Sequence, residues 1–306
     1  MNKIILFYKY IAIQYPKQVM KWQQEICKNL NLLGRILISH EGINGTLGGS
    51  KSNLDQYIAF MNAHELFSGI DFKKSDGGSE CFPRLSVKVR EEAVSLGIPY
   101  DQLTARTGGQ HLTPEQTHQL IADNPQDLVI LDARNNYEWE IGRFENAITP
   151  DIKNFRDLPQ YLDENLDQFK DKQVLMYCTG GIRCERATAY LNEKNIAKKV
   201  YQVEGGIVRY AEQYPDGFFR GKNYVFDGRI SMKINDDILS SCTLCTIACD
   251  DYHNCLNAAC NKHFICCNQC IQQYNKTCSQ NCKTLIEENK VQLRPEFNKI
   301  SSLPKQ

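Results

Sequence analysis

The chain of 306 residues has no net charge, because 36 acidic residues balance its 36 lysines and arginines. It therefore lacks the global positive field that recruits nucleic acid to many proteins. It also lacks an apolar run of about 18 residues, so we expect no membrane span. The apolar stretch that begins at Ile4 is interrupted at Tyr8 and has no small-residue cleavage site. It predicts a strand rather than a signal peptide, and we expect a cytoplasmic protein.

Two kinds of cofactor site are missing as well. The sequence contains no glycine-rich dinucleotide-binding fingerprint, so we see no flavin or nicotinamide site. It has no obvious set of two histidines and one carboxylate for a non-haem iron. No internal repeat or low-complexity tract is present either. The unusual feature of the composition is instead its cysteine content.

Fourteen cysteines occur in a chain without a secretion signal, which indicates a reducing compartment where thiols serve metal binding or chemistry. Two pairs, Cys242 with Cys245 and Cys267 with Cys270, have the two-residue spacing that lets two sulfurs grip one tetrahedral ion. The candidate metal ligands all lie between residues 242 and 282: Cys242, Cys245, Cys249, Cys255, Cys260, Cys266, Cys267, Cys270, Cys278 and Cys282.

We predict one or two structural zinc ions in this Cys-rich segment, with His253 and His263 as further candidate ligands. Disulfides are an alternative that the redox poise of the cytosol disfavours. An iron–sulfur cluster is another, because ligation by four cysteines alone does not distinguish it from zinc. The spacing does not say which cysteines share an ion. The segment has few large apolar residues, so cross-links of some kind must replace a core.

Charge is distributed unevenly along the chain. The net charge is +3 for residues 1–110, −5 for residues 111–221 and +2 for residues 222–306. An anionic partner would therefore find its basic surface on the flanking parts. The imbalance is small, and an ordinary solvated surface explains it equally well.

The length favours two or three domains, and residues 1–95 predict a ferredoxin-like α+β domain. Strand and helix signals alternate there in the order βαββαβ. Pro16 opens the first helix, where the first turn tolerates a proline. The predicted strands cover residues 3–13, 34–39, 70–74 and 85–89, and the predicted helices follow Pro16 and Ser52.

Residues 39–49 of this domain are dense in turn-forming residues, and Asn44-Gly45 is a hairpin-type turn signal. Turn chemistry alone predicts no more than a turn here. The alternative is a loop whose His40, Glu41 and Asn44 face a ligand, and Glu41 and Asn44 are kept as candidate substrate-binding residues.

A parallel α/β domain is predicted over residues 111–221, after a linker over residues 96–110. Thr113 and Pro114 have the N-cap and first-turn positions of a helix that opens the domain. Its predicted strands cover residues 128–132, 174–177 and 199–203, with a helix at 184–194. The Cys-rich, zinc-binding segment is placed at 222–290 and a disordered tail at 291–306.

A reactive cysteine is predicted at Cys178, in the stretch QVLMYCTGGIRCE over residues 173–185. A strand that ends at a cysteine, turns through Gly180 and Gly181 and enters a helix builds a cradle of backbone N–H groups. The positive helix end and Arg183 should lower the pKa of the Cys178 thiol and make its sulfur nucleophilic. A buried cysteine at a strand end is the ordinary alternative.

This loop resembles the active-site loop of the rhodanese family, whose pattern is Cys-x-x-Gly-x-Arg. Phosphatases of this fold have a longer loop, so four residues between Cys178 and Arg183 favour the sulfur type. Arg143 stands where many rhodaneses have histidine. The other matching residues, in the family's order, are Leu128–Arg134 (LVILDAR), then Glu138, Gly142 and Ala147, and then Val203–Gly206 (VEGG).

Nearly the whole chain resembles one family, the bacterial tRNA uridine(34) hydroxylases. They combine an acylphosphatase-like front, a rhodanese domain with CTGGIRC and a Cys-rich end. The front has no Gly-Arg phosphate loop after its first strand, so acylphosphatase activity is not implied. Further stretches that look familiar are residues 41–47 (EGINGTL), 82–92 (FPRLSVKVREE) and 224–227 (YVFD).

The resemblance implies hydroxylation of the anticodon wobble uridine of tRNA to 5-hydroxyuridine, with molecular oxygen as co-substrate. The catalytic residues would be Cys178, Arg183 and Cys184. Residues that would bind substrate are Gly180, Gly181, Asp132, Arg134, Glu41 and Asn44. Because anticodon bases are unstacked, aromatic and arginine side chains could hold a splayed base without melting a duplex.

The chemistry at Cys178 remains open at the level of sequence. Its thiolate could add to uridine C6, which activates C5, or an oxidised or persulfide sulfur could deliver the oxygen equivalent. Cys184 could resolve an oxidised Cys178 or be a buried cysteine at the helix start. A persulfide sulfurtransferase is the alternative function. A third, an RNA- or protein-binding module with an inert rhodanese domain, is disfavoured by the presence of Cys178 and Arg183.

Overall fold

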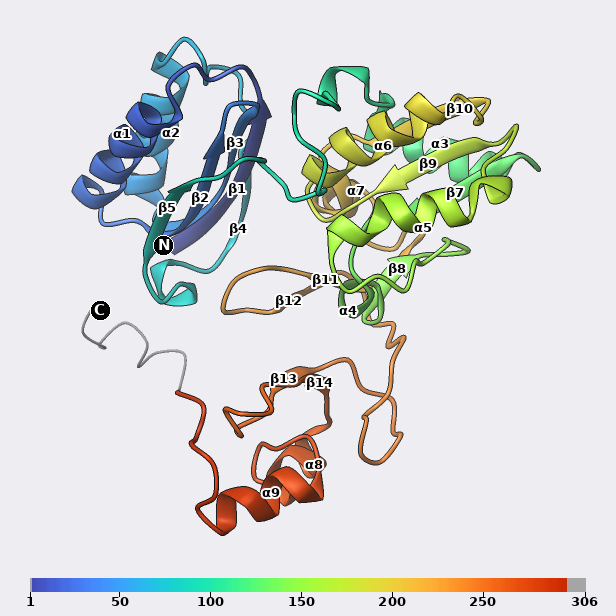
Figure 1. The fold of residues 1–306 in the computed structure, drawn as a ribbon. Coiled ribbons are helices and arrows are strands. Elements are labelled where there is room, and N and C mark those ends of the chain that lie inside the picture. The colour runs from blue at the N-terminus through green and yellow to red at the C-terminus, as the bar shows by residue number, and fades with distance from the viewer. Residues whose placement is uncertain (1, 296–306) are drawn as a thin grey trace.

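The structure is a computed structural model that describes residues 2–295, and Figure 1 shows its three parts. An N-terminal domain with a five-stranded sheet lies beside a domain with a four-stranded sheet, and the Cys-rich segment lies below both. Most of the predicted tail over residues 291–306 lies outside the described residues. Among residues 2–295, no helix combines the length and apolar character needed to cross a membrane.

The N-terminal domain is ferredoxin-like, as predicted, but its order is βαββαββ and its strand β3 was not among the predicted strands. Its five-stranded sheet has the order β4-β1-β3-β2-β5, in which β5 pairs with β2 in parallel and the other pairs are antiparallel. Both helices cover one face of this sheet (Figure 1). The elements are β1 (Asn2–Tyr10), α1 (Pro16–Asn29), β2 (Leu33–Ser39), β3 (Gly42–Ser50), α2 (Lys51–Ala63), β4 (Lys73–Asp76) and β5 (Leu85–Val89).

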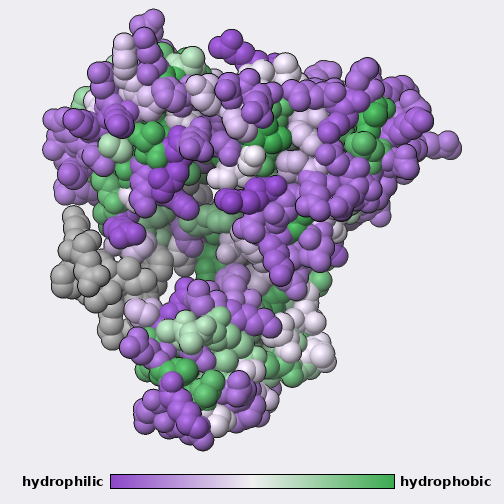
Figure 2. Space-filling view, viewed as in Figure 1, coloured by the Kyte–Doolittle hydropathy of each residue, from purple (hydrophilic) through white to green (hydrophobic). Residues whose placement is uncertain are grey.

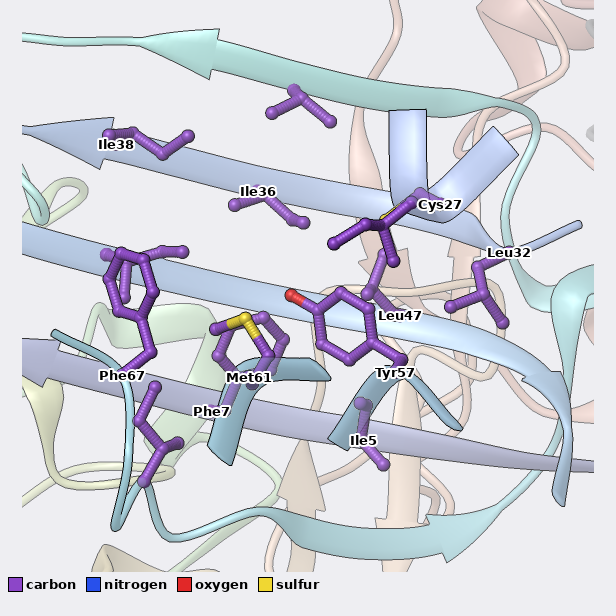
Figure 3. Packing of buried hydrophobic residues seen from close by; sticks show 14 of the residues in the cluster. Ile5, Phe7, Cys27, Leu32, Ile36, Ile38, Leu47, Tyr57, Met61 and Phe67 are labelled. Atoms are coloured by element: carbon purple, nitrogen blue, oxygen red, sulfur yellow. The ribbon is translucent and has the colours of Figure 1, made fainter. Parts of the chain in front are cut away.

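Strand β1 shows how alternation builds this domain. Ile5 and Phe7 point into the core between sheet and helices, where Figure 3 shows them near Tyr57 and Met61. Successive residues of a strand point to opposite faces, so Leu6 and its even-numbered neighbours face the other way. That second face points toward the central domain, and it decides how the Cys178 loop is covered.

The turn predicted within residues 39–49 is present, but Asn44-Gly45 does not form it. Residues 42–50 form β3, which lies inside the sheet and pairs with both β1 and β2. Its glycines serve close packing rather than turning, since a Cβ atom on Gly45 would lie 2.4 Å from the Phe7 ring. The actual turn is at His40 and Glu41, between β2 and β3.

The central domain is the predicted parallel α/β domain, with sheet order β6-β10-β9-β7. Thr113 and Gln116 form a capping box that begins α3, as the sequence indicated. The elements are β6 (Gln110–Leu112), α3 (Pro114–Asp123), β7 (Leu128–Asp132), α4 (Asn136–Trp139), β8 (Gly142–Phe144), α5 (Leu158–Glu164), β9 (Gln173–Tyr177), α6 (Ile182–Lys194), β10 (Lys199–Val203) and α7 (Gly206–Gln213).

Both faces of the parallel sheet are buried, which explains the continuous apolar run in β9. Val174 and Met176 belong to the core that contains α5 and α6, whereas Leu175 and Tyr177 belong to the core that contains α3 and α7. Parallel sheets of this kind place their loops at the carboxyl ends of the strands, where ligands bind. The Cys178 loop follows β9 at such an end.

The remaining elements form two small sheets. Strands β11 (Phe219–Tyr224) and β12 (Ser231–Lys233) make a hairpin that pairs with β8 of the central domain. In the Cys-rich segment, β13 (Tyr252–Asn254) pairs with β14 (His263–Ile265), followed by α8 (Asn268–Gln273) and α9 (Gln280–Glu287). In Figure 2 the surface is mainly hydrophilic, and hydrophobic residues show mostly between the parts and on this segment.

Candidate active site

The Cys178 loop joins the end of β9 to the start of α6. Gly181 has φ +104°, a left-handed conformation that suits glycine, and its N–H donates to the Cys178 sulfur at 3.2 Å. The turn after β10 holds the loop from the other side, because Ile207 N–H donates to the Cys178 carbonyl at 3.0 Å. A Cβ atom on Gly206 would lie 2.5 Å from that carbonyl, which accounts for the second glycine of VEGG.

The surroundings of Cys178 favour its thiolate. Burial opposes ionisation of the thiol. Three effects outweigh it: a hydrogen bond from the Cys184 thiol, the positive charge of Arg183 and hydrogen bonds from backbone N–H groups of α6. The pKa of Cys178 therefore falls from 9.0 to about 6. The pKa of Cys184 shifts the other way, because burial and then the bond to Cys178 raise it well above its usual value. Cys184 is therefore a thiol that donates to the thiolate.

Arg183 is fixed by a carboxylate that the predicted catalytic set did not include. Its guanidinium donates two hydrogen bonds to Glu138, at 2.6 and 2.7 Å, and the Glu138 side chain is fully buried. Thr179 Oγ1 also donates to Glu138, at 3.3 Å. The Glu-x-x-x-Gly match was a usable signal for Glu138, because a fixed arginine needs a fixed partner.

Asp132 and Arg134, predicted to bind substrate, form a buried ion pair in this structure. Both side chains are fully buried, and two hydrogen bonds of 2.8 and 2.7 Å join them. Arg134 also donates to the Gly142 carbonyl at 2.6 Å. The pair thus fixes the backbone of β7 and β8 beside the active-site loop.

The second face of β1 covers the active-site loop. A Cβ atom on Gly180 would lie 2.8 Å from the Leu6 side chain, and one on Gly181 would lie 2.7 Å from the Tyr8 hydroxyl. The absence of side chains at Gly180 and Gly181 therefore lets β1 of the N-terminal domain pack closely on the loop, and Cys178 is completely buried. The sequence contained a signal for this contact, because β1 has large residues on both of its faces and a second buried face needs a partner.

Hydrogen bonds fix this domain contact. The Tyr8 hydroxyl donates to Glu185 at 3.0 Å, and the Tyr10 hydroxyl donates to the Ile182 carbonyl at 3.4 Å, both on α6. Burial and then nearby anions, Glu185 first, raise the pKa of Tyr8 far above its usual value. Tyr8 therefore remains a neutral donor near the thiolate.

Glu41 and Asn44 bind other parts of the chain in this structure, not an open site. Glu41 accepts from Ala93 N–H at 2.7 Å and pairs with the buried Arg186 of α6 at 2.7 Å. Asn44 donates to the Ala93 carbonyl at 3.1 Å. His40 contacts the Ile13 carbonyl at 3.0 Å. Of the three, Glu41 joins the N-terminal domain to α6, and the ligand-binding role of Glu41 and Asn44 stays a prediction.

A cavity of about 570 Å³ lies directly beside the active-site loop. Thr179, the residue after Cys178, forms part of its wall, and so does Leu6 of β1. The β11–β12 hairpin, α7 and β4 complete the lining. The N-terminal domain, the central domain and the β11–β12 hairpin, which begins the predicted segment 222–290, therefore contribute to one site. Its volume is in the range of small-ligand pockets.

Three domain families match successive parts of the chain. They are the UPF0176 acylphosphatase like domain at residues 2–93, the rhodanese-like domain at 113–213 and the rhodanase C-terminal domain at 220–283. The chain is 42% identical over 287 residues to the tRNA uridine(34) hydroxylase of Corynebacterium urealyticum. The aligned residues cover 91% of this chain and 96% of that protein. The protein belongs to the tRNA uridine(34) hydroxylase family.

Other hydroxylases of this family are similar over the same length. The Corynebacterium jeikeium protein is 43% identical over 277 residues, which cover 88% of this chain and 89% of that protein. The Chlamydia abortus protein is 40% identical over 290 residues, covering 92% and 87%. The resemblance seen in the sequence motifs is thus confirmed across the N-terminal, rhodanese and Cys-rich parts.

The Cys-rich segment of this hydroxylase family member contains two groups of four sulfurs. The first group is Cys242, Cys245, Cys267 and Cys270, and the second is Cys255, Cys260, Cys278 and Cys282. Within each group all sulfurs lie within 4.8 Å of one another, and all fourteen cysteines are free thiols. The groups alternate along the chain, so the first and third pairs form one site and the second and fourth form the other.

The remaining candidate ligands lie outside these groups. Cys249 and Cys266 are buried, and the Cys266 sulfur is 4.0 Å from Cys242. His263 stacks on Tyr252, with ring centroids 4.2 Å apart, and its Nε2 contacts the Tyr224 hydroxyl at 3.3 Å. His253 likewise belongs to neither group. His263 thus joins the Cys-rich segment to β11.

The thiolate assignment predicts the pH dependence of alkylation. Cys178 is buried, so iodoacetamide reaches it only when the domain contact opens, and modification should be slow. Because only the thiolate reacts, its rate should rise with pH through a midpoint near the pKa of about 6 and then level off. Arg183→Ala should move the midpoint upward, since a positive neighbour is lost. Peptide mass spectrometry separates Cys178 from the other thiols.

The control for this experiment is Arg156→Ala, because Arg156 is an exposed arginine of the same domain. Arg183→Ala is also made together with Glu138→Gln, so that no unpaired carboxylate stays buried. An unchanged midpoint in both Arg183 variants would contradict the role given to the guanidinium.

Proposed function

We propose that this protein hydroxylates C5 of uridine 34, the wobble base of the tRNA anticodon, to give 5-hydroxyuridine. The names of its relatives support this reaction and favour it over sulfur transfer. The observation that carries the proposal to this chain's own residues is Cys178, whose pKa of about 6 leaves a thiolate at neutral pH. Cys178 is buried, and the residue that follows it, Thr179, lines the cavity. A tRNA substrate and fourteen free thiols support a cytoplasmic location.

The thiolate of Cys178 is the group that activates uracil. Its addition forms a sulfur–carbon bond at C6 and moves the C5–C6 double-bond electrons toward C5 and O4, which makes C5 nucleophilic. After oxygen is attached and the C5 proton is lost, the thiolate leaves and the double bond returns. A thiol with a low pKa suits both steps, because its anion forms readily and is a good leaving group.

The other catalytic residues act on the thiolate. The Gly181 N–H and the Cys184 thiol donate to its sulfur, and Arg183 adds positive charge while Glu138 fixes the guanidinium. Molecular oxygen is the co-substrate that supplies the hydroxyl oxygen. The second oxygen atom becomes water with two electrons from a reductant.

We also propose that each group of four cysteines holds one structural Zn²⁺ ion. A tetrahedral site with Zn–S distances of about 2.3 Å has sulfurs about 3.8 Å apart. The sulfur distances fit, at 3.7 Å for Cys245–Cys267, 3.6 Å for Cys260–Cys278 and 3.9 Å for Cys278–Cys282. Zinc has no redox role in such closed four-thiolate sites, so it would stabilise the segment and take no part in hydroxylation.

The function is tested by nucleoside mass spectrometry of tRNA from cells that lack this protein. We expect 5-hydroxyuridine to disappear from the anticodon position and to return when the protein is supplied. Purified protein is assayed with thiosulfate in parallel. Unchanged 5-hydroxyuridine together with brisk thiosulfate turnover would contradict the hydroxylase and establish the sulfurtransferase.

A further inference from the structure

The cavity beside Thr179 contains a buried polar group that has no hydrogen-bond partner among residues 2–295. Asn223 of β11 lines the cavity and is 1% exposed, and its Oδ1 has no hydrogen-bond partner. An unsatisfied buried carbonyl costs about 1–3 kcal/mol, so its retention calls for an explanation. A ligand that donates an N–H group in the cavity would supply the missing bond.

The walls around Asn223 suit a flat, mostly apolar ligand. Apolar surface of the cavity comes from Leu6 of β1, from Val225, which follows β11, and from Ile234, which follows β12. A planar ring can lie between such side chains while its edge meets the carboxamide of Asn223. A pyrimidine base has this shape, and the cavity volume of about 570 Å³ leaves room for its ribose.

Phe226 adds an exposed aromatic surface at the same place. Its side chain lines the cavity yet is 58% exposed, unusual for a phenylalanine. The ring packs on the Arg183 guanidinium, 5.7 Å from its centroid, and edge-on to Tyr224 at 5.3 Å. One part of the ring is thus fixed by the catalytic arginine, and the rest is open to a stacking partner.

We propose that this cavity binds the target uracil, with Asn223 reading the base edge and Phe226 providing the stacking surface. Asn223 Oδ1 accepts from uracil N3–H and its amide donates to uracil O4, a pairing that matches both groups. Phe226 stacks on a base of the splayed anticodon, as aromatic residues do in single-stranded RNA recognition. This inference rests on the proposed function, and it makes Asn223 and Phe226 specificity-determining residues.

Charge at the cavity rim agrees with a nucleotide ligand. Lys74 and Lys233 line the cavity, with side chains 48% and 62% exposed, and they pair with Asp55 and Asp236. The charged lining residues as a whole are Lys73, Lys74, Arg229 and Lys233 against Asp76, Glu212 and Asp227, a small basic excess. Phosphate contacts position RNA and base contacts specify it, so these lysines would hold the backbone while Asn223 selects the base. Changing Asn223 should therefore alter base selection more than overall tRNA affinity.

Photocrosslinking tests where the base binds. An anticodon stem-loop RNA with 4-thiouridine at position 34 is irradiated with the full-length protein, which is then digested with trypsin. Cleavage after Lys222 and Arg229 releases one peptide, residues 223–229, that contains both Asn223 and Phe226. We expect crosslinks on this peptide, and crosslinks confined to other peptides would overturn the proposal.

Kinetics with two variants test what the residues do. Asn223→Leu should lower kcat/KM for tRNA hydroxylation about 10- to 100-fold, the usual effect of losing a base-edge contact. Phe226→Leu should weaken binding about 10-fold, whereas Phe226→Tyr keeps the ring and most of the activity. Phe60→Leu is the matched control, because Phe60 is 50% exposed on α2, away from the cavity.

The outcomes separate the two proposals. An unchanged pH midpoint for Cys178 alkylation shows that Asn223→Leu leaves the active-site loop intact. If that variant hydroxylates tRNA as well as wild type, the role of Asn223 is wrong although the function stands. If wild type makes no 5-hydroxyuridine, the proposed function fails, and the crosslinked peptide still decides whether the cavity binds the base.

Discussion

Removal of metal from the Cys-rich segment will unfold it. Structural zinc contributes about 10–16 kcal/mol to the folding of small zinc-binding domains, and this segment has little else to hold it. Its buried cluster consists largely of cysteines with a few larger residues such as Phe264 and Ile265. We expect two zinc ions per chain by elemental analysis, and loss of the segment's protection from proteolysis after chelation.

Because the two groups of cysteines alternate along the chain, replacing one cysteine should release more metal than the one ion it binds. The chain between Cys245 and Cys267 contains Cys255 and Cys260 of the other group, so each ion holds the loop that carries the other. Cys267→Ala should therefore lower the metal content by more than one ion. Cys249→Ala is the control, because it changes a buried cysteine of the same segment outside both groups.

Other results would contradict this account of the segment. Metal-free protein whose thiols do not react even in denaturant would establish disulfides. Iron with acid-labile sulfide would establish a cluster. A protein that loses both ions and keeps its resistance to proteolysis would show that the segment has a core of its own.

Arg134→Met will destabilise the rhodanese domain by about 3–5 kcal/mol, the usual cost of leaving one member of a buried ion pair unpaired. Asp132 and Arg134 are both completely buried, so Asp132 would remain in the core without its partner. The double variant Asp132→Asn with Arg134→Met should recover much of this loss, because no buried charge is left.

The measurement is urea unfolding followed by fluorescence. The protein has two tryptophans, and a Trp22→Phe background leaves Trp139, which lies in the rhodanese domain, as the reporter. If Arg134→Met lowered tRNA affinity with no loss of stability, the predicted role of Arg134 in substrate binding would be supported instead.

Local motifs made the central domain and its reactive loop predictable. The Cys178 loop depends on residues within one strand–turn–helix unit, so glycine conformation, helix polarity and Arg183 could all be read together. The capping residue Thr113 was equally local. Features of this kind are set by neighbours in sequence, and the structure places them as the pattern indicates.

Features set by distant parts of the chain were not predictable in this way. Gly45 is a strand residue because the Phe7 ring packs against it, and turn chemistry cannot show that. Tyr8 is an active-site neighbour because β1 covers the loop after β9. Asn223 and Phe226 become important only once the hairpin closes the cavity. In the Cys-rich segment the spacing defined pairs, and only the fold defines which pairs meet.

The central claim is that this protein places an oxygen atom on uridine 34 through Cys178. The most direct test incubates purified protein with unmodified tRNA, a reductant and isotopically labelled oxygen gas, followed by nucleoside mass spectrometry. Wild type should form 5-hydroxyuridine that carries the label, and the nearly isosteric variant Cys178→Ser should form none. Full labelled product from Cys178→Ser, or unlabelled product from wild type, would contradict the account.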